Sequence, residues 1–201
     1  MKTTITQHPA TSDILIFNNV IITYPKIFEP SASYDAKPED RKVFSCTILA
    51  EKETDLTLYN KMITDLIALK VPEKELGIVK VREPKMDGDI QDLKHKFNEN
   101  YRGFWYFNAK AAEDRPPVIV DSDGATTLHR NSGKLYGGCI VNIQVAAWFF
   151  ATKGLGIAFD LLGIQYVSEG TRMGSAPVPR DTIQGGFVAV NTTSDDPLGG
   201  I

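Results

Sequence analysis

The stretch GFWYFNAK, residues 103–110, sets four aromatic side chains in a row on one short segment. Successive side chains of a β-strand point to opposite faces, so Trp105 and Phe107 share one face while Phe104 and Tyr106 share the other. One pair can enter a core, whereas burying both pairs requires cover on both sides of the strand. The segment therefore predicts either a strand covered on both faces or a barrel strand with one exposed aromatic face.

The rest of the chain supplies further strands around this one. The first predicted strand, 14–24, is interrupted at Asn18-Asn19, which indicates a bulge or a bend. Pro25 is predicted to end it, because proline cannot donate a hydrogen bond to a strand ladder. The other predicted strands cover residues 42–49, 104–109, 118–120, 135–151 and 156–167.

One helix is predicted between the second and third of these strands. Acidic residues and a candidate cap stand at its start, Glu53 to Asp55, and Lys70 stands at its end, as the helix dipole favours. Pro72 stops it. Its apolar side chains fall on one face, which predicts packing against a sheet. The predicted fold is mainly β: an OB-like five- to six-stranded barrel with one packed α-helix and flexible termini.

The composition divides the chain into one domain with irregular additions. Residues 1–12, rich in Thr and Ser, are predicted to form a flexible N-terminal arm, and residues 13–170 the OB-like domain. Within that domain, the charged stretch 77–101 is predicted to be a mobile excursion. Residues 171–201, rich in Gly, Pro, Ser and Thr, are predicted to be an irregular C-terminal tail.

The overall composition is that of a soluble globular protein. The chain has 201 residues, of which 42% are hydrophobic and 23% are charged. It contains no run of 18 or more apolar residues that would span a membrane, and its first residues lack the apolar core of a signal peptide. The sequence therefore predicts a cytoplasmic protein with no membrane partner.

Charge distribution bears on nucleic-acid binding more than the net charge of −3 does. The stretch from Gly124 to Phe159 contains no Asp or Glu, yet it carries Arg130, Lys134 and Lys153 among aromatic residues. Such segregation can build one basic groove on an acidic protein. The alternative interpretation is that these residues simply form two buried strands.

Signatures of catalysis and of metal binding are few. The sequence has no phosphate-binding loop and no nucleophile elbow, and its three histidines share no metal-ligand spacing. Cys46 and Cys139 lie in apolar runs and are predicted to be buried free thiols. Asp87, Asp89 and Asp92 could hold a divalent ion through oxygen ligands, but the later Glu of a calcium loop is missing. We predict a non-enzymatic protein without a cofactor.

Two further segments place aromatic rings where they can be exposed. Tyr24, Lys26 and Phe28 combine two rings with a cation just after a predicted strand, which suits a clamp at a barrel rim or ordinary turn packing. Trp148 and Phe150 share one strand face, opposite to Phe149, and one of these two sets is predicted to enter the core.

Segments spread over the chain resemble a family of phage single-stranded-DNA-binding proteins with OB folds. The resemblance covers roughly residues 14 to 170, and its matching pieces are YPKIFEP (24–30), FSCTILAEK (44–52), YRGFWYFNAK (101–110), RPPVIVD (115–121), LYGGC (135–139), KGLGI (153–157) and IQYVSEG (164–170). It implies sequence-tolerant binding of single-stranded DNA during phage DNA replication and recombination, in the host cell cytoplasm and without a cofactor. It also implies that the C-terminal tail contacts phage replication or recombination proteins, although this tail ends at Ile201 rather than at an aromatic residue.

The expected binding residues combine rings for base stacking with cations for phosphates. The stacking candidates are Tyr24, Phe28, Trp105, Tyr106 and Phe107. The phosphate candidates are Lys26, Arg102, Lys110, Arg115, Lys134 and Lys153.

Two other functions stay open at this point, and so does the oligomeric state, including a homo-oligomer. A protein-interaction or virion-structural domain would place Trp105 and Tyr106 at a subunit interface. A metal-dependent nuclease would use the Asp87, Asp89 and Asp92 carboxylates.

Overall fold

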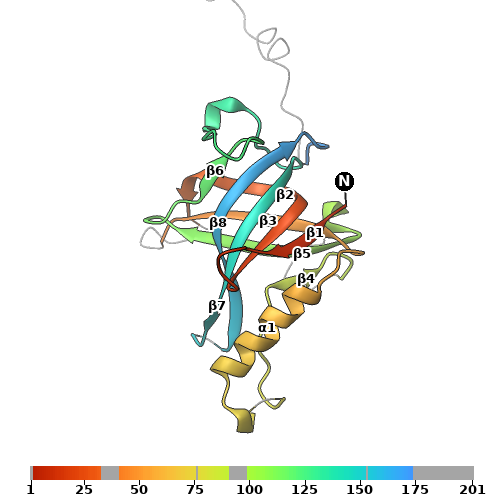
Figure 1. The fold of residues 1–201 in the computed structure, drawn as a ribbon, viewed down its shortest axis with the longest axis vertical. Coiled ribbons are helices and arrows are strands. Elements are labelled where there is room, and N and C mark those ends of the chain that lie inside the picture. Colours follow the sequence, from red (N-terminus) through yellow and green to blue (C-terminus); the bar gives the residue numbers. More distant parts are fainter. Residues whose placement is uncertain (1, 33–40, 76, 91–98, 153, 174–201) are drawn as a thin grey trace, which may run out of the picture.

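A closed five-stranded barrel forms the centre of the molecule (Figure 1). The computed structural model describes residues 2–32, 41–75, 77–90, 99–152 and 154–173. The barrel strands are antiparallel except where β5 and β8 run in parallel and close the ring, with Ala109 opposite Phe159. In ring order they are β2 (Ile14–Ser31), β3 (Val43–Glu51), β5 (Phe104–Ala112), β8 (Gly156–Ser168) and β7 (Ile140–Phe150). The predicted OB-like barrel is confirmed.

Three short strands outside the ring each pair with one barrel strand. β1 (Thr4–Gln7) pairs with β2, β4 (Lys85–Asp87) pairs with β5, and β6 (Val118–Val120) pairs in parallel with β8. Single 3-10 turns stand at η1 (Glu73–Glu75), η2 (Glu99–Tyr101) and η3 (Arg130–Ser132). The strands β1 and β4 are absent from the sequence-based prediction because their short segments are mostly polar and carry no readable alternation, whereas that prediction includes the three apolar residues of β6.

The expected N-terminal arm and the expected excursion both differ from the structure. Thr4–Gln7 are a paired strand, and Ile5 is buried in the core, so this part of the arm is ordered. Lys85–Asp87 likewise form β4 inside the stretch 77–101. In both places pairing with a neighbouring strand supplies the order, and a polar local sequence does not reveal it. Residues 174–201, most of the predicted tail, lie outside the described residues.

A cluster of aromatic rings fills the barrel. Phe107 on β5 is fully buried and lies 5.0 Å from Phe17 and 6.1 Å from Phe159, measured between ring centroids. Tyr59, from the helix α1 (Thr57–Lys70), adds its ring 5.5 Å from Phe107. The Tyr59 hydroxyl donates to Glu83 at 3.2 Å, so its polar end is satisfied at the barrel rim.

The helix α1 closes one end of the barrel, below it in Figure 1. Tyr59 and Ile63 are its buried residues, which confirms the predicted packing of one helical face on the sheet. The helix begins at Thr57 rather than near Glu53. The N-cap residue is Leu56, which makes no side-chain cap hydrogen bond. Asp55, within the predicted cap stretch, accepts a hydrogen bond from the Thr57 amide at 2.9 Å.

The first irregularity of β2 lies at Asn18-Asn19, where the sequence predicts one. Between Phe17 and Val20, β2 advances three residues while β7 advances two, which is the register shift of a bulge. Asn19 takes a positive φ of 53°. Its backbone N–H donates to the side-chain oxygen of Asn142 at 2.9 Å, so this N–H has a hydrogen-bond partner outside the strand ladder.

A second bulge corrects the expected end of this strand. Between Thr23 and Lys26, β2 again advances one residue more than its partner, here β3, and Tyr24 takes a φ of 47°. Pro25 lies inside this bulge, where its missing amide hydrogen costs no ladder bond. The strand therefore continues through the proline to Ser31.

The predicted strand 135–151 also begins later than expected, at Ile140. The residues before it make a glycine turn whose Gly138 has a φ of 109°. A Cβ atom at Gly138 would lie 1.9 Å from the Thr171 carbonyl oxygen, so only glycine permits this contact. Cys46 and Cys139 are both buried free thiols as predicted, and burial raises the pKa of Cys46 to about 12.

The core position of Phe107 predicts a large loss of stability on truncation. Phe107→Ala should lower the free energy of unfolding by about 3–5 kcal/mol, because it removes a ring that touches three others. Val118→Ala, at a side chain that is 66% exposed, is the matched control and should change it by less than about 0.5 kcal/mol. Urea unfolding of both variants measures the difference, and Phe107→Leu serves if the alanine variant does not fold. Equal stabilities would contradict this assignment of the core.

Candidate nucleic-acid interface

A groove of about 550 Å³ runs over the outer faces of β5, β7 and β8, beside the chain that leads into β4. Inward residues of these strands fill the core, so their alternate residues line the groove. Its aromatic, basic and amide side chains come from all of these segments. We call it the aromatic–basic groove and define it by Arg82, Met86, Asn108, Lys110, Trp148 and Phe150.

The aromatic wall of this groove is the end of β7. Trp148 is 46% exposed, and its ring lies 5.6 Å from that of Phe150. Across the ladder, Trp148 faces Ala158 and Phe150 faces Gly156, both small residues. A Cβ atom at Gly156 would lie 2.4 Å from the Phe150 ring, so the glycine lets this ring lie close against the neighbouring strand. The wall therefore offers two adjacent rings to solvent.

Arg82 reaches this wall from the segment before β4. Its backbone is fixed against β8, because its amide donates to Leu155 at 3.0 Å and its carbonyl accepts from Ile157 at 2.8 Å. The guanidinium lies 5.4 Å from the centre of the Phe150 ring, a cation–π distance. A cation and a ring thus stand together at the groove.

The floor of the groove is the outer face of β5. Asn108 accepts a hydrogen bond from Thr47 at 2.8 Å, which fixes the orientation of its amide. Lys110 is exposed, and its cross-strand neighbour on β3 is Ser45. On the other side of β3, Ser45 is opposite the exposed Lys26 of β2. The two lysines therefore lie in one row across three strands.

Tyr106 extends the outward row of β5 beyond Asn108. Its ring lies 4.9 Å from that of Tyr101, and Met86 on β4 is its cross-strand neighbour. Since Met86 also lines the aromatic–basic groove, Tyr106 continues the aromatic surface past the edge of the groove.

The four-aromatic segment follows the second expectation, with one face of the strand on the core and the other face directed outward. Phe107 is wholly buried, so it is excluded from base stacking and its expected stacking role is wrong. Trp105 points to the same side and packs against the core at the barrel end. The Lys52 ammonium lies 3.9 Å and the Lys85 ammonium 5.0 Å from the Trp105 ring, so lysines cover this ring. The outward face keeps Tyr106 as a stacking candidate.

The remaining expected residues scatter around the barrel. Tyr24 is 62% exposed on the second β2 bulge, whereas Phe28 packs against the core. Arg102 is exposed beside η2. Arg115 lies 3.7 Å from the Asp160 carboxylate, and Lys153 lies outside the described residues.

Lys134 belongs to a different part of the surface. It pairs with Asp121, and its ammonium lies 5.5 Å from the centre of the Tyr166 ring. Tyr166 stands ten residues along β8 from Gly156, which is about 33 Å of strand. Lys134 therefore does not join the aromatic–basic groove.

Five groove residues are missing from the expected set: Arg82, Met86, Asn108, Trp148 and Phe150. Alternation along β7 does place Trp148 and Phe150 on one face, and that face is the outward one. Nothing local marks Arg82, because a single bridge to Gly156, distant in sequence, brings it to the groove.

The carboxylate cluster has a structural role. The Lys52 ammonium pairs with Asp87 and lies 3.2 Å from Asp89, so one cation serves both carboxylates. Hydrogen bonding from Lys52 lowers the pKa of Asp87, and a backbone hydrogen bond from Gly103 lowers that of Asp89. These contacts tie β4 and the following turn to the barrel, which weakens the nuclease hypothesis; Asp92 lies outside the described residues. Within the described ranges, no group of three His, Cys, Asp or Glu side chains is arranged to hold a metal ion.

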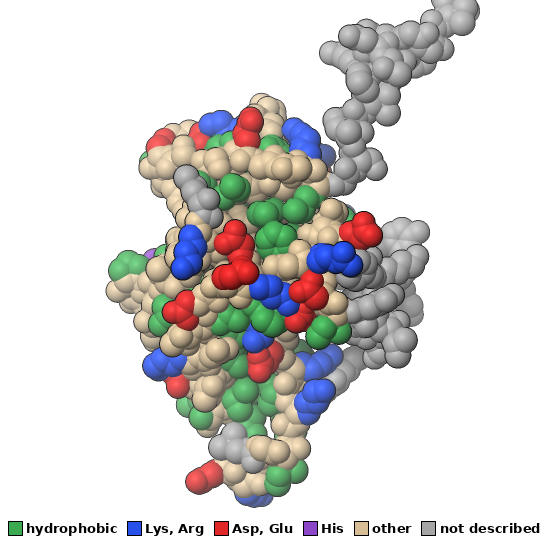
Figure 2. Space-filling view, turned by 90° about the vertical axis from the view of Figure 1, so that its right-hand side faces the viewer, with side chains coloured by type: hydrophobic (Ala, Val, Ile, Leu, Met, Phe, Trp, Pro, Cys, Tyr) green, Lys and Arg blue, Asp and Glu red, His purple; other side chains and the backbone are tan. Residues whose placement is uncertain are grey.

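Charges are mixed rather than segregated on the face that Figure 2 shows. Acidic and basic side chains stand next to each other there, with hydrophobic side chains between them. The aromatic–basic groove has a mixed lining too, because Glu83 and Asp160 line it together with Arg82 and Lys110. Among the described residues, no helix is long and apolar enough to cross a membrane.

Comparison with known proteins gives one family and several similar structures. The family model described as the ssDNA-binding protein of Enterobacter phage Enc34 matches residues 13–196. The single-stranded DNA-binding protein from bacteriophage Enc34, solved in complex with ssDNA, superposes with a TM-score of 0.65 at 23% identity, over 82% of this chain and 91% of that one. The same phage protein solved alone gives 0.63 at 20% identity, over 92% and 99% of the two chains.

A structure from another phage has the same fold. The single-stranded DNA-binding protein gp2.5, encoded by bacteriophage T7, superposes with a TM-score of 0.50 at 17% identity, over 88% of this chain and 98% of that one. At these identities the superpositions establish the shared fold. Among curated proteins, none matches this chain.

The two tryptophans should differ in their access to solvent. In Trp105→Phe only the exposed Trp148 emits, so acrylamide should quench the fluorescence strongly. In Trp148→Phe only the lysine-covered Trp105 emits, and quenching should be several-fold weaker. Stern–Volmer plots of both variants give the comparison. The reverse order of quenching would contradict the assignment of the outward face.

Proposed function

Because this chain belongs to the family of the Enterobacter phage Enc34 ssDNA-binding protein, we propose that it binds single-stranded DNA along the aromatic–basic groove. The observation that supports this site best is the adjacent pair of outward rings, Trp148 and Phe150, with Arg82 beside Phe150 and Lys110 in the same groove. Exposed rings on a barrel strand can stack with nucleic-acid bases, whose flat faces match them in shape.

Stacking supplies the first part of the binding free energy. A base against the ring of Trp148 or Phe150 contributes about 1–3 kcal/mol, and every base has a face that can stack. Asn108 is the amide in the groove that can reach a base edge. Binding should therefore tolerate many sequences, because the groove offers rings in preference to base-specific hydrogen bonds.

Cations along the same path supply the second part. Arg82 stands beside the Phe150 ring, and Lys110 and Lys26 continue the path across β5, β3 and β2. Each can contact a phosphate while the neighbouring base stacks. Tyr106 is a further stacking candidate where the strand leaves the groove. Tyr24 and Arg102 are candidate contacts elsewhere on the barrel surface.

The wider role follows from the family and from the expected mechanism. We infer a non-enzymatic protein that coats single-stranded DNA in phage replication and recombination, in the host cytoplasm and without a cofactor. We also infer that the C-terminal segment contacts phage replication or recombination proteins. The competing function is a protein-interaction or virion-structural domain, in which the same rings would contact another protein.

Removing the aromatic wall should weaken binding strongly. Trp148→Ala is expected to lose about 1–3 kcal/mol of binding free energy for an oligothymidine, because one stacked base loses its partner. Fluorescence anisotropy of a labelled strand at fixed salt measures the loss. Trp105→Phe is the matched control and should bind as the unchanged chain does. If the unchanged chain gives neither an anisotropy change nor a gel shift, the competing protein-interaction function is favoured.

The salt dependence of binding should identify the phosphate contacts. Lys110→Gln is expected to reduce the slope of log affinity against log salt by about 0.7, the value for one phosphate contact on a single strand. Lys134 pairs with Asp121 far from the groove, so Lys134→Gln should leave the slope unchanged. Titrations at several salt concentrations give both slopes. Equal slopes for the two variants would remove Lys110 from the proposed path.

A further inference from the structure

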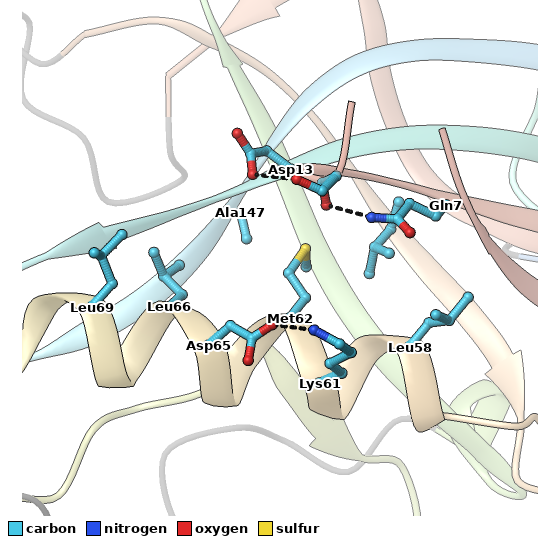
Figure 3. A pocket seen from close by; sticks show the side chains of 11 residues that line it. Gln7, Asp13, Leu58, Lys61, Met62, Asp65, Leu66, Leu69 and Ala147 are labelled. Atoms are coloured by element: carbon cyan, nitrogen blue, oxygen red, sulfur yellow. Dashed lines mark hydrogen bonds and ion pairs between the residues drawn. The ribbon is translucent and has the colours of Figure 1, made fainter. Parts of the chain in front are cut away.

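The side of β7 that carries Trp148 faces away from the helix. Ala147 points toward α1, as Figure 3 shows, and lines the pocket between the helix and the strands. Neighbouring residues of a strand point to opposite faces, so Ala146 and Trp148 point to the side of the aromatic–basic groove. Along β7, Phe150 stands next to the Trp148 ring on one side, and the small Ala146 on the other side leaves room for a stacked base.

A first row of outward residues crosses from β7 to β5 through Trp148. This tryptophan is opposite Ala158 of β8. In the parallel register of β8 and β5, Ala109 is opposite Phe159, so the residues one step before them, Asn108 and Ala158, share a row. The small Ala158 therefore stands between the Trp148 ring and the Asn108 amide, and all three line the aromatic–basic groove.

A second row lies beside the first and has a carboxylate at its centre. Asp160 of β8 is opposite Ala146 of β7 and opposite Lys110 of β5. It lines the groove, and its side chain is 34% exposed. Across the β7–β8 ladder Asp160 is the diagonal neighbour of Trp148, and such neighbours are about 7–8 Å apart. A base stacked on the Trp148 ring therefore brings its edge to this carboxylate.

The amide and the carboxylate beside this ring differ in hydrogen-bonding chemistry. The Asn108 side-chain oxygen accepts from the Thr47 hydroxyl at 2.8 Å, so the NH2 group of this amide is directed to donate elsewhere. The ionised Asp160 carboxylate only accepts. Its ion pair with Arg115 is 3.7 Å long, beyond the roughly 2.7–2.9 Å of a charge-assisted hydrogen bond, so its oxygens keep their capacity to accept from a ligand. A donor and an acceptor thus stand side by side in the groove.

We propose that Asn108 and Asp160 bind the edge of the base that stacks on Trp148, and that they favour cytosine and adenine over thymine and uracil. The amino group of cytosine donates to Asp160, while the neighbouring ring nitrogen accepts from the Asn108 NH2 group. Adenine presents the same pair of groups. In thymine and uracil both groups are reversed, so a carbonyl oxygen faces the carboxylate and an N–H faces the amide N–H. Asp160 is then a specificity-determining residue of the proposed DNA binding, on which this inference rests.

The preference is small beside the total affinity. Each bound chain places one base against Asn108 and Asp160, while other bases meet rings and cations that accept any base. A good pair of base-edge hydrogen bonds discriminates by about fivefold to 150-fold. Because Asp160 is partly exposed to water, the lower end of this range is expected. Binding therefore stays tolerant of sequence.

The test compares two single strands that differ only in the base edge. Labelled deoxycytidine and deoxyuridine oligomers of about 15 nucleotides are titrated with the full chain by fluorescence anisotropy, at neutral pH and equal salt. Uracil lacks the methyl group of thymine, so the two bases have nearly the same area for stacking. The deoxycytidine strand should bind about fivefold more tightly.

Two carboxylate variants separate base recognition from charge. Asp160→Asn removes a negative charge and adds a donor that can pair with the uracil carbonyl, so the preference for deoxycytidine should disappear. Glu83→Gln removes the same charge from the same groove, but Glu83 belongs to the segment before β4 and accepts from the Tyr59 hydroxyl at 3.2 Å. This control should change the affinity for both strands by one factor, because a charge effect acts on the backbone that the strands share. Circular dichroism checks that both variants fold.

The ratio of the two affinities decides the outcome. Equal binding of the two strands by the unchanged chain would overturn the proposal. A preference that survives in Asp160→Asn, or that Glu83→Gln abolishes as completely, would overturn it as well. Binding of neither strand would instead overturn the proposed function, and this inference with it, so the two failures are distinguishable.

Discussion

The parallel contact between β5 and β8 is the constraint on which the other features depend, because it closes the barrel. Phe107 and Phe159 meet inside at this junction, with the rings of Phe17 and Tyr59 against them. Once these rings point inward, strand alternation sends Asn108 and Lys110 outward. The floor of the aromatic–basic groove is thus a direct consequence of how the core is packed.

The groove also shows how a barrel exposes large rings without losing its packing. Trp148 and Phe150 stand opposite Ala158 and Gly156, so the small residues make room for the rings on the outer face. Burying such rings would contribute to stability, and leaving them exposed gives that contribution up. That stabilisation is recovered when a base covers the ring. A ring that lowers the stability of the free protein therefore adds to the affinity of the complex.

The sequence predicts the parts of this structure that rest on local pattern, and it misses those that rest on distant contacts. Long alternating strands, the helix and the Asn18-Asn19 bulge follow from spacing and residue type. Alternation separates Trp105 and Phe107 from Tyr106, but which side is the core depends on the closure against β8. Pro25 was expected to end β2, because no local signal shows that it falls in a bulge. Arg82 joins the groove through a single bridge to Gly156, and no spacing within the sequence predicts that.

One strand, β7, separates the groove from the helix. Ala147 lines the pocket beside α1 and Trp148 lines the aromatic–basic groove, because neighbouring residues of a strand point to opposite faces. A change on the helix side of β7 therefore reaches the groove only through the backbone of that strand. The exposed ring of Trp148 keeps its position as long as β7 keeps its pairing with β8.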